Sequence, residues 1–333
     1  KGKMKRNVDL LEGPIAGSLA KLAFPIMGTS LIQMAYNLVD MIWIGRISSN
    51  AVAAIGAAGM YMWLANGITT IPRMGGQVTV GQSLGAMDKD AAIDYARGSI
   101  RMGTLLGILY GIISVIFSGP LIGFFKLNSP DVIHDAKMYL IITCGAIVFS
   151  FLNQVFTGIL AAMGNTMATF RATTIGLIIN IVLDPLFIFG FGPVPRMEVT
   201  GAAIATVLAQ IIVFLLYLVT VWNEPVIFKH IHLMQKTEKQ HVSEIVRIGF
   251  PSAIQDALFS GISMVIARLI AGWGDAAVAV QKVGSQIESI SWMAAGGFST
   301  AVNAFVAQNY GAGKKERIKK GYKTAMGIMA LWG

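Results

Sequence analysis

One segment of this chain occurs twice, and this duplication constrains the fold more than any other feature. Residues 24–89 align without a gap with residues 250–315, shifted by 226 positions. The clearest landmarks are Phe24-Pro25, Gln82, Gly85-Ala86 and Lys89, which return as Phe250-Pro251, Gln308, Gly311-Ala312 and Lys315. Internal duplication of a long apolar chain is typical of secondary transporters built from two halves. The copies differ at Asp40, which corresponds to Ile266, so we expect the first half to carry the charge-dependent chemistry.

The composition indicates a membrane protein. The chain is 55% hydrophobic and only 13% charged, whereas soluble domains carry about 25% charged residues. Apolar runs of roughly 20 residues, long enough to cross a bilayer, occur repeatedly. We predict eight spans and the start of a ninth near Tyr322: Leu22–Ile44, Ala51–Val78, Met102–Phe125, Met138–Met163, Ala168–Phe189, Gly201–Trp222, Ile245–Ile270 and Ala276–Val306. Backbone groups in lipid must bond within their own segment, so the sequence predicts an all-α, polytopic fold.

The distribution of positive charge predicts the orientation. The net charge is +9, but 19 of the 26 Lys and Arg residues fall in alternate loops on one side. This asymmetry places the N-terminus in the cytoplasm and argues for a lipid bilayer rather than a nucleic acid as the partner. A single cysteine, Cys144, excludes a disulfide framework and a thiolate metal site.

The most polar long stretch divides the chain into two halves. We predict an N-terminal lobe of six helices over residues 1–222, a cytoplasmic linker over 223–244, and the start of a second lobe over 245–333. By its own symmetry we expect the protein to continue beyond Gly333, although a natural protein of eight or nine spans is the alternative. Gly103, Gly107 and Gly111 in the third span predict close helix packing.

Four polar residues of the first span share one helix face. Gln33, Tyr36, Asn37 and Asp40 are spaced at i, i+3, i+4 and i+7. An acidic group inside a span is costly and marks a functional site by default. The alternative is that Asp40 reaches the outer interface or caps a neighbouring backbone.

The fifth span supplies a second polar set. Asn180 and Asp184 are one turn apart, and Pro185 removes the hydrogen bond to the carbonyl of Ile181. Two carboxylates, an amide and a free carbonyl are suited to a proton or a sodium ion. Burial and like charge both favour the protonated form of one carboxyl group. The alternative is that Asp184-Pro185 only ends a helix near the outer interface.

The remaining charged residues within spans carry less weight. Lys282 and Glu288 of the eighth span mark the opposite cavity wall or form an internal ion pair, and Asp256 of the seventh span is a weaker candidate site. Arg73 follows Pro72 inside the second span. No phosphate-binding loop, nucleophile elbow or zinc-protease motif is present in the sequence, so we expect a transporter and not an enzyme.

The ordered motifs of this chain resemble the multidrug and toxic compound extrusion (MATE) family. The segments that carry the resemblance are Phe24-Pro25, Tyr36–Asp40, Ile44–Arg46, Gly81–Ala86, Gly158–Thr166, Asn180–Gly190, Gly201–Thr206 and Gln308–Gly313. Each segment alone is weak evidence, but their order and combination are specific and run through essentially the whole chain.

The resemblance implies a MATE-type bundle of twelve helices in two lobes, of which about eight to nine lie in this chain. It implies export of organic cations or drugs against a proton or sodium gradient. In the branch that resembles the DinF proteins, the acid of the first span corresponds to Asp40. The sites implied by that branch are a coupling pocket of Tyr36, Asp40, Asn180, Asp184 and Thr206 and a substrate cavity lined by Gln33, Tyr36, Asp40 and Asn153. The same pocket implies a sodium site at Asp40, Asn180, Asp184 and Thr206. The other, NorM-like branch relies on an acid that corresponds here to Phe259.

These observations lead to a main hypothesis and an alternative. The main hypothesis is a drug antiporter of the cell membrane, without a cofactor other than the coupling ion, that works as a monomer. The alternative is a lipid-linked saccharide flippase, which requires a cavity rich in Arg and Lys. An integral-membrane enzyme is the least supported class.

Overall fold

The computed structural model describes residues 8–222 and 224–333; the side chains at 264, 267, 268, 271, 275, 276, 278, 279, 282, 283 and 286 are outside that description. The ends of the predicted lobe and linker at residues 1–7 and 223 therefore lie outside the described residues. The elements are helical, with one isolated bridge between Phe191 and Val194. The α-helices are α1 (Ile15–Gly45), α2 (Ser49–Gly85), α3 (Lys89–Ile116), α4 (Ser118–Gly123), α5 (Pro130–Gly145), α6 (Ile147–Ala162), α7 (Met167–Phe189), α8 (Val199–Trp222), α9 (Lys239–Ala271), α10 (Asp275–Gly311) and α11 (Lys315–Trp332). A 3₁₀ turn, η1 (Phe228–His230), lies between α8 and α9.

The predicted spans coincide with helices, although the third, Met102–Phe125, covers parts of both α3 and α4 and extends two residues beyond α4. The protein is a multi-pass membrane protein. Within the described residues, six helices are long and apolar enough to cross a membrane, namely α1, α2, α3, α7, α8 and residues Ile287–Gly311 of α10. The fourth predicted span is bent by 45° between α5 and α6 and would make a seventh. The seventh predicted span lies in α9, whose described residues include the polar Gln255, Asp256, Ser260 and Ser263.

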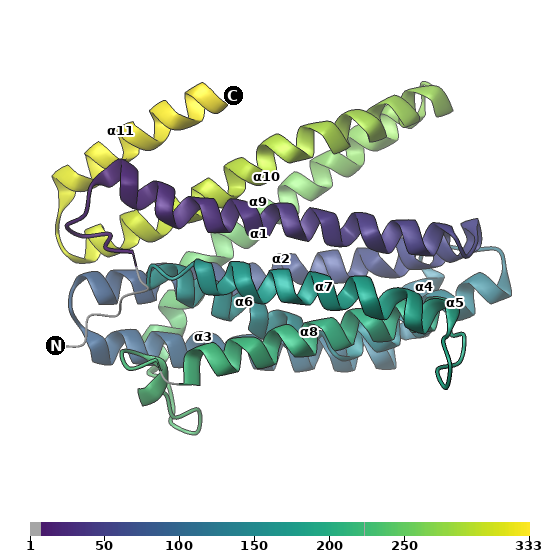
Figure 1. The fold of residues 1–333 in the computed structure, drawn as a ribbon, viewed down its shortest axis with the longest axis horizontal. Coiled ribbons are helices and arrows are strands. Elements are labelled where there is room, and N and C mark those ends of the chain that lie inside the picture. The colour runs from purple at the N-terminus through teal and green to yellow at the C-terminus, as the bar shows by residue number, and fades with distance from the viewer. Residues whose placement is uncertain (1–7, 223) are drawn as a thin grey trace.

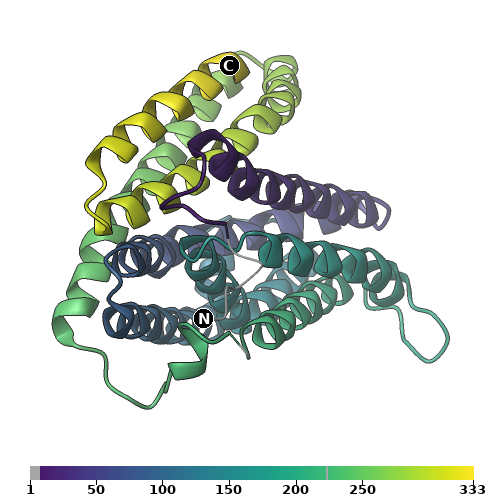
Figure 2. The ribbon, with the colours of Figure 1, turned by 60° about the vertical axis from the view of Figure 1, so that its left-hand side comes forward.

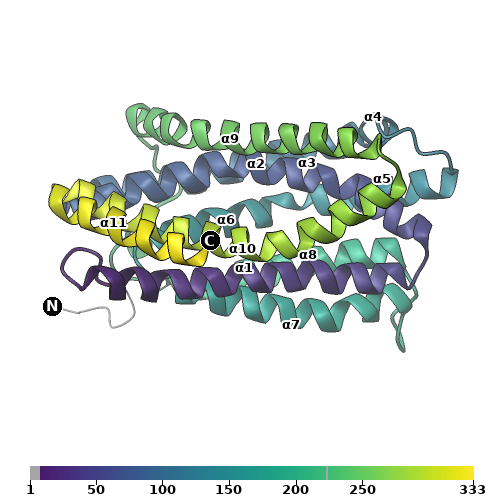
Figure 3. The ribbon, with the colours of Figure 1, turned by 90° about the horizontal axis from the view of Figure 1, so that it is seen from above.

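The helix boundaries reproduce the duplication seen in the sequence. Helix α10 begins and ends 226 residues after α2, at Asp275 and Gly311 against Ser49 and Gly85. Helix α9 likewise repeats α1, and α11 begins where a repeat of α3 would begin. Viewed from above, α1 lies beside α10 and α9 lies beside α2 (Figure 3). Each copy therefore packs its first helix against the second helix of the other copy.

Helices α2 and α10 cross in close contact, and equivalent residues of the two copies meet there. The Gln77 amide nitrogen donates to Asn303 Oδ1 at 3.1 Å, and these two positions are equivalent under the shift of 226 residues. Gly85 lies against the backbone carbonyl of Gln308, and Gly311 lies against that of Gln82. From this crossing, α9 and α10 diverge from the bundle formed by α2 to α8 (Figures 1 and 2).

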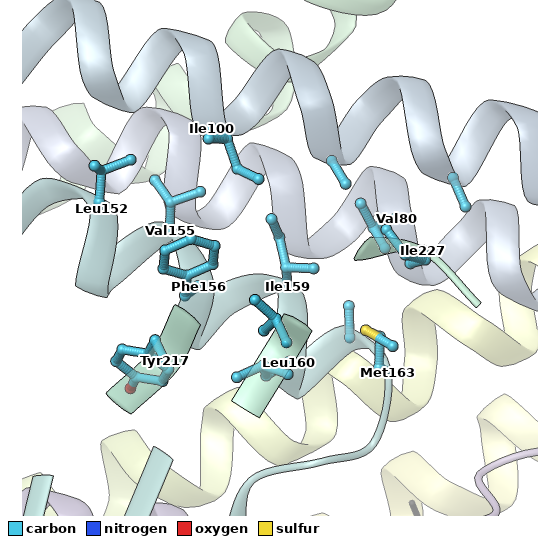
Figure 4. Close-up of a cluster of buried hydrophobic side chains, with 14 of the residues drawn as sticks. Val80, Ile100, Leu152, Val155, Phe156, Ile159, Leu160, Met163, Tyr217 and Ile227 are labelled. Atoms are coloured by element: carbon cyan, nitrogen blue, oxygen red, sulfur yellow. The ribbon is translucent and has the colours of Figure 1, made fainter. Parts of the chain in front are cut away.

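We call the end of the bundle with this crossing the basic end, because the turns there (86–88, 163–166 and 312–314) and the α8–α9 linker adjoin most of the Lys and Arg residues. A core of buried side chains from α2, α3, α6, α7, α8 and the linker fills this end of the first lobe, and Figure 4 shows Phe156, Ile159 and Tyr217 among them. The predicted glycine packing is confirmed, because Gly103, Gly107 and Gly111 of α3 abut Val155, Val148 and Gly145.

Residues 8–13 tie the two halves together at the basic end. The amide of Val8 donates to the carbonyl of Gly164 in the first lobe at 3.0 Å. Leu10 is buried, and its carbonyl accepts from Asn309 Nδ2 at 2.9 Å and from Arg317 Nε at 3.1 Å. The N-terminal segment therefore bridges the α6–α7 turn and the α10–α11 turn.

Helix α9 begins at Lys239, so residues 239–244 of the predicted linker range 223–244 are helical. Contacts with α3 explain this early start. Asp94 of α3 accepts from the backbone amide of Glu238 at 3.2 Å and contacts His241 Nδ1 at 2.5 Å. Its other oxygen accepts from Arg97 at 2.8 Å. These bonds fix the first turn of α9 against the first lobe, although its residues are too polar to be counted as part of a span.

Candidate functional site

Two carboxyl groups from distant parts of the chain meet between α1 and α7. Asp40 and Asp184 lie within hydrogen-bonding reach of each other. Asn180 joins them: its amide nitrogen is 3.0 Å from Asp40 Oδ1 and 3.1 Å from Asp184 Oδ2 in the orientation in which its oxygen accepts from the Tyr36 hydroxyl at 3.3 Å. That orientation satisfies both ends of the amide. We call Tyr36, Asp40, Asn180 and Asp184 the carboxyl cluster.

Local helix geometry and helix packing together place this cluster. Tyr36 with Asp40, and Asn180 with Asp184, are each one turn apart and so project from one face. Helix α1 lies along α7, held by a bond from Thr166 Oγ1 to the carbonyl of Leu22 at 2.9 Å and by an edge-to-face contact between Trp43 and Phe189. These contacts flank the cluster and set its register.

The cluster is shielded from water. Asn180 is 0% and Asp184 is 1% exposed, and Tyr36 is also buried, whereas Asp40 is partly exposed. In the described part of the chain, neither carboxyl group takes part in an ion pair. A buried carboxylate without a positive partner is strongly destabilised. The arrangement therefore favours binding a proton or another cation.

Thr206 and a residue that sequence reasoning missed complete the surroundings. The Tyr139 hydroxyl of α5 lies beside the Thr206 side chain of α8 and is within electrostatic range of both carboxyl groups. Thr206 Oγ1 also donates to the carbonyl of Ala202 at 3.0 Å. Tyr139 had no signal in the sequence, because a lone tyrosine in an apolar run resembles any core aromatic residue.

A cavity of about 520 Å³ adjoins the cluster. Asp40 and Tyr36 form one part of its wall, and the predicted lining residues Gln33 and Asn153 form others. Aromatic and methionine side chains contribute as well, from Tyr139, Tyr217, Trp63, Met41 and Met62. No Lys or Arg lies among the lining residues of this part of the described chain. The cavity is therefore negative at the cluster and otherwise neutral.

A sodium ion at the cluster would need ligands besides carboxylates. Within the described residues, no three His, Cys, Asp or Glu side chains come together in a way that could hold a metal ion. Asp40, Asp184, the Asn180 oxygen and the Thr206 hydroxyl are all hard oxygen ligands suited to such an ion. Binding of a sodium ion at this site stays a prediction.

Three other charged residues of the spans, Arg73, Asp256 and Glu288, are not among the residues that line the cavity. Asp256 of α9 accepts from Thr70 Oγ1 of α2 at 2.9 Å, and Arg73 is within electrostatic range of Asp256. These contacts join the two halves. The side chains of Lys282 and Gln286 lie outside the described residues. Phe259, at the position of the acid in the other branch, packs against Trp292.

Comparison with known proteins settles the family. The sequence profile of the MatE family matches residues 25–186 and 251–333. The chain belongs to the MatE family. The predicted resemblance is thus confirmed, whereas the DinF-like branch stays a prediction.

Individual relatives agree with this assignment. A probable multidrug resistance protein NorM of Thermotoga maritima is 31% identical over 307 residues, which cover 91% of this chain and 65% of that protein. An FAD transporter of Shewanella oneidensis is 28% identical over 327 residues, which cover 95% of this chain and 70% of that protein. A crystal structure of MATE in the straight conformation superposes with a TM-score of 0.90 at 25% identity, covering 99% of this chain and 73% of that one. The chain spans about two thirds of the length of these relatives.

Proposed function

We propose that this protein exports organic cations and drug-like compounds in exchange for protons or sodium ions. The observation that carries the proposal is the carboxyl cluster, which has no positive partner among the described residues. Its Asn180 and Asp184 are buried, and its Tyr36 and Asp40 line a cavity of about 520 Å³. The Thermotoga maritima relative is named a probable multidrug resistance protein, and this name supports the proposal that drug-like compounds are exported.

The charge of the carboxyl cluster couples export of the organic cation to uptake of the proton or sodium ion. When the cluster is deprotonated, its negative charge and the cavity's aromatic side chains attract a flat organic cation. Protonation of Asp40 and Asp184 from outside removes that attraction, and the cation leaves. Helix α1 carries Pro25 in its interior, which lets it bend or shift as the charge changes. Release of the proton on the cytoplasmic side restores the state that binds the organic cation. The proton and the organic cation need only shift the populations of two existing conformations of the protein.

We also propose that the protein works as a monomer in the cell membrane, with its N-terminus in the cytoplasm. Lys and Arg residues gather at the basic end, which the positive-inside rule assigns to the cytoplasm. A saccharide flippase or a flavin carrier would have to bind a pyrophosphate. The described cavity lining offers no Lys or Arg for that group.

Transport in proteoliposomes tests this function. The full-length protein should move ethidium when a pH gradient is imposed, and repeating the assay with sodium identifies the coupling ion. D40N, which keeps the size of the side chain but cannot ionise, should remain folded and lose export. D131N, which changes an exposed acid at the start of α5, is the control and should export normally. Undiminished export by D40N refutes the proposed role of the cluster.

A further inference from the structure

One face of α8 runs from the carboxyl cluster into the cavity. Thr206, Gln210, Val213 and Tyr217 all line the cavity and follow the spacing of a single helix face. Thr206 is next to Tyr139 at the cluster. Gln210 lies one turn further along, roughly 6 Å at a rise of 1.5 Å per residue. Along α8, the cavity wall therefore passes from the carboxyl cluster at Thr206 to the Gln210 amide one turn further on.

At the amide end, Gln210 fixes the orientation of Asn153 of α6. The Asn153 amide nitrogen donates to the backbone carbonyl of Gln210 at 3.1 Å and to Gln210 Oε1 at 3.0 Å. Both hydrogens of this nitrogen are thus used. The amide cannot turn over without losing two hydrogen bonds, so its oxygen is held in one direction.

That oxygen is a buried acceptor without a partner. Asn153 is 7% exposed, and its Oδ1 makes no hydrogen bond with any described residue. Leaving a buried acceptor unpaired is unfavourable, and Asn153 lines the cavity. The neighbouring Thr157 hydroxyl cannot supply the missing donor, because it donates to the backbone carbonyl of Asn153 at 2.8 Å and contacts the Tyr217 hydroxyl at 2.9 Å.

We propose that Gln210 is a positioning residue that holds Asn153 as an acceptor for an N–H or O–H group on the transported cation. The preferred cargo then has two recognition points: a positive charge for the carboxyl cluster and a hydrogen-bond donor for Asn153. This inference rests on the proposed function and specifies its substrate class.

Two lipophilic cations separate donor recognition from charge recognition. Ethidium carries two aromatic amines, whereas tetraphenylphosphonium has no N–H or O–H group. Binding of each to the purified full-length protein gives the ratio of their dissociation constants. Q210M keeps an unbranched side chain of similar length but removes the acceptor, and Q210E keeps an acceptor. Q154L removes a different amide from the cavity wall, one with no bond to Asn153, and serves as the control.

The expected result is a change in the ratio. Q210M should weaken ethidium binding about tenfold, the effect of one hydrogen bond, while tetraphenylphosphonium changes less than about twofold. Q210E and Q154L should keep the wild-type ratio, even where they change the affinity for both cations by the same factor. The inference is overturned if Q210M keeps the wild-type ratio of dissociation constants, or if Q210E changes that ratio as Q210M is expected to. Thermal unfolding checks each variant, and Q210E decides the matter if Q210M does not fold.

The outcome is distinguishable from a failure of the proposed function. If the wild-type protein moves neither cation in proteoliposomes, the proposed function is wrong. If it moves ethidium and Q210M keeps the wild-type ratio, only the role of Gln210 is wrong.

Discussion

The crossing of α2 and α10 leaves no space for a side chain at two glycines. A Cβ atom at Gly85 would stand 1.8 Å from the carbonyl oxygen of Gln308, and one at Gly311 would stand 1.8 Å from that of Gln82. Real Cβ atoms essentially never approach another atom closer than 3.0 Å. G85A or G311A must therefore push the helices apart by at least about 1.2 Å.

The size of the effect follows from two opposing terms. Overpacking costs about 1–3 kcal/mol, and the upper part of that range applies because a backbone carbonyl cannot rotate away. Replacing a helical glycine by alanine returns about 0.5–1 kcal/mol. Each variant should thus lose about 1–2 kcal/mol of unfolding free energy. The double variant should lose less than the sum, because one separation of the helices relieves both clashes.

Equilibrium unfolding of the full-length protein in detergent measures these values. G56A, on the same helix but with open space around its Cβ position, is the control and should be as stable as the wild type or slightly more stable. G85A and G311A should behave alike, because the two positions are related by the duplication. Wild-type stability in both variants, or a strong effect in only one, contradicts the symmetric close contact.

Two further predictions concern polar contacts. N180L removes the amide that joins Asp40, Asp184 and Tyr36; it should lower the unfolding free energy by about 1–3 kcal/mol and abolish ethidium export, and normal export would exclude a coupling role for this amide. D94A removes the acceptor shared by Arg97, His241 and the backbone of Glu238; it should cost about 1–3 kcal/mol and increase proteolysis of the linker over residues 224–238. The exposed D90A in the first turn of α3 is its control, and equal proteolysis of D94A and D90A would show that Asp94 does not hold the linker.

Periodic and repeated features of the chain could be predicted from the sequence. Helix type, span positions and the polar faces of Gln33 to Asp40 and of Asn180 with Asp184 depend on spacing within single helices, which a sequence displays directly. The duplication was equally visible, and the boundaries of α2 and α10 repeat it residue for residue. The start of α9 at Lys239 could not be predicted from the sequence, because its first turn is stabilised by Asp94 of another helix.

The joining of these faces was decided only by the tertiary structure. Whether one amide contacts both Asp40 and Asp184 depends on the register of α1 against α7, which packing contacts such as Trp43 with Phe189 determine. Tyr139 and Gln210 acquire their places because α5 and α8 bring them to the cavity. Spacing along one helix determines what shares a face, but only side-chain packing between helices determines what that face meets.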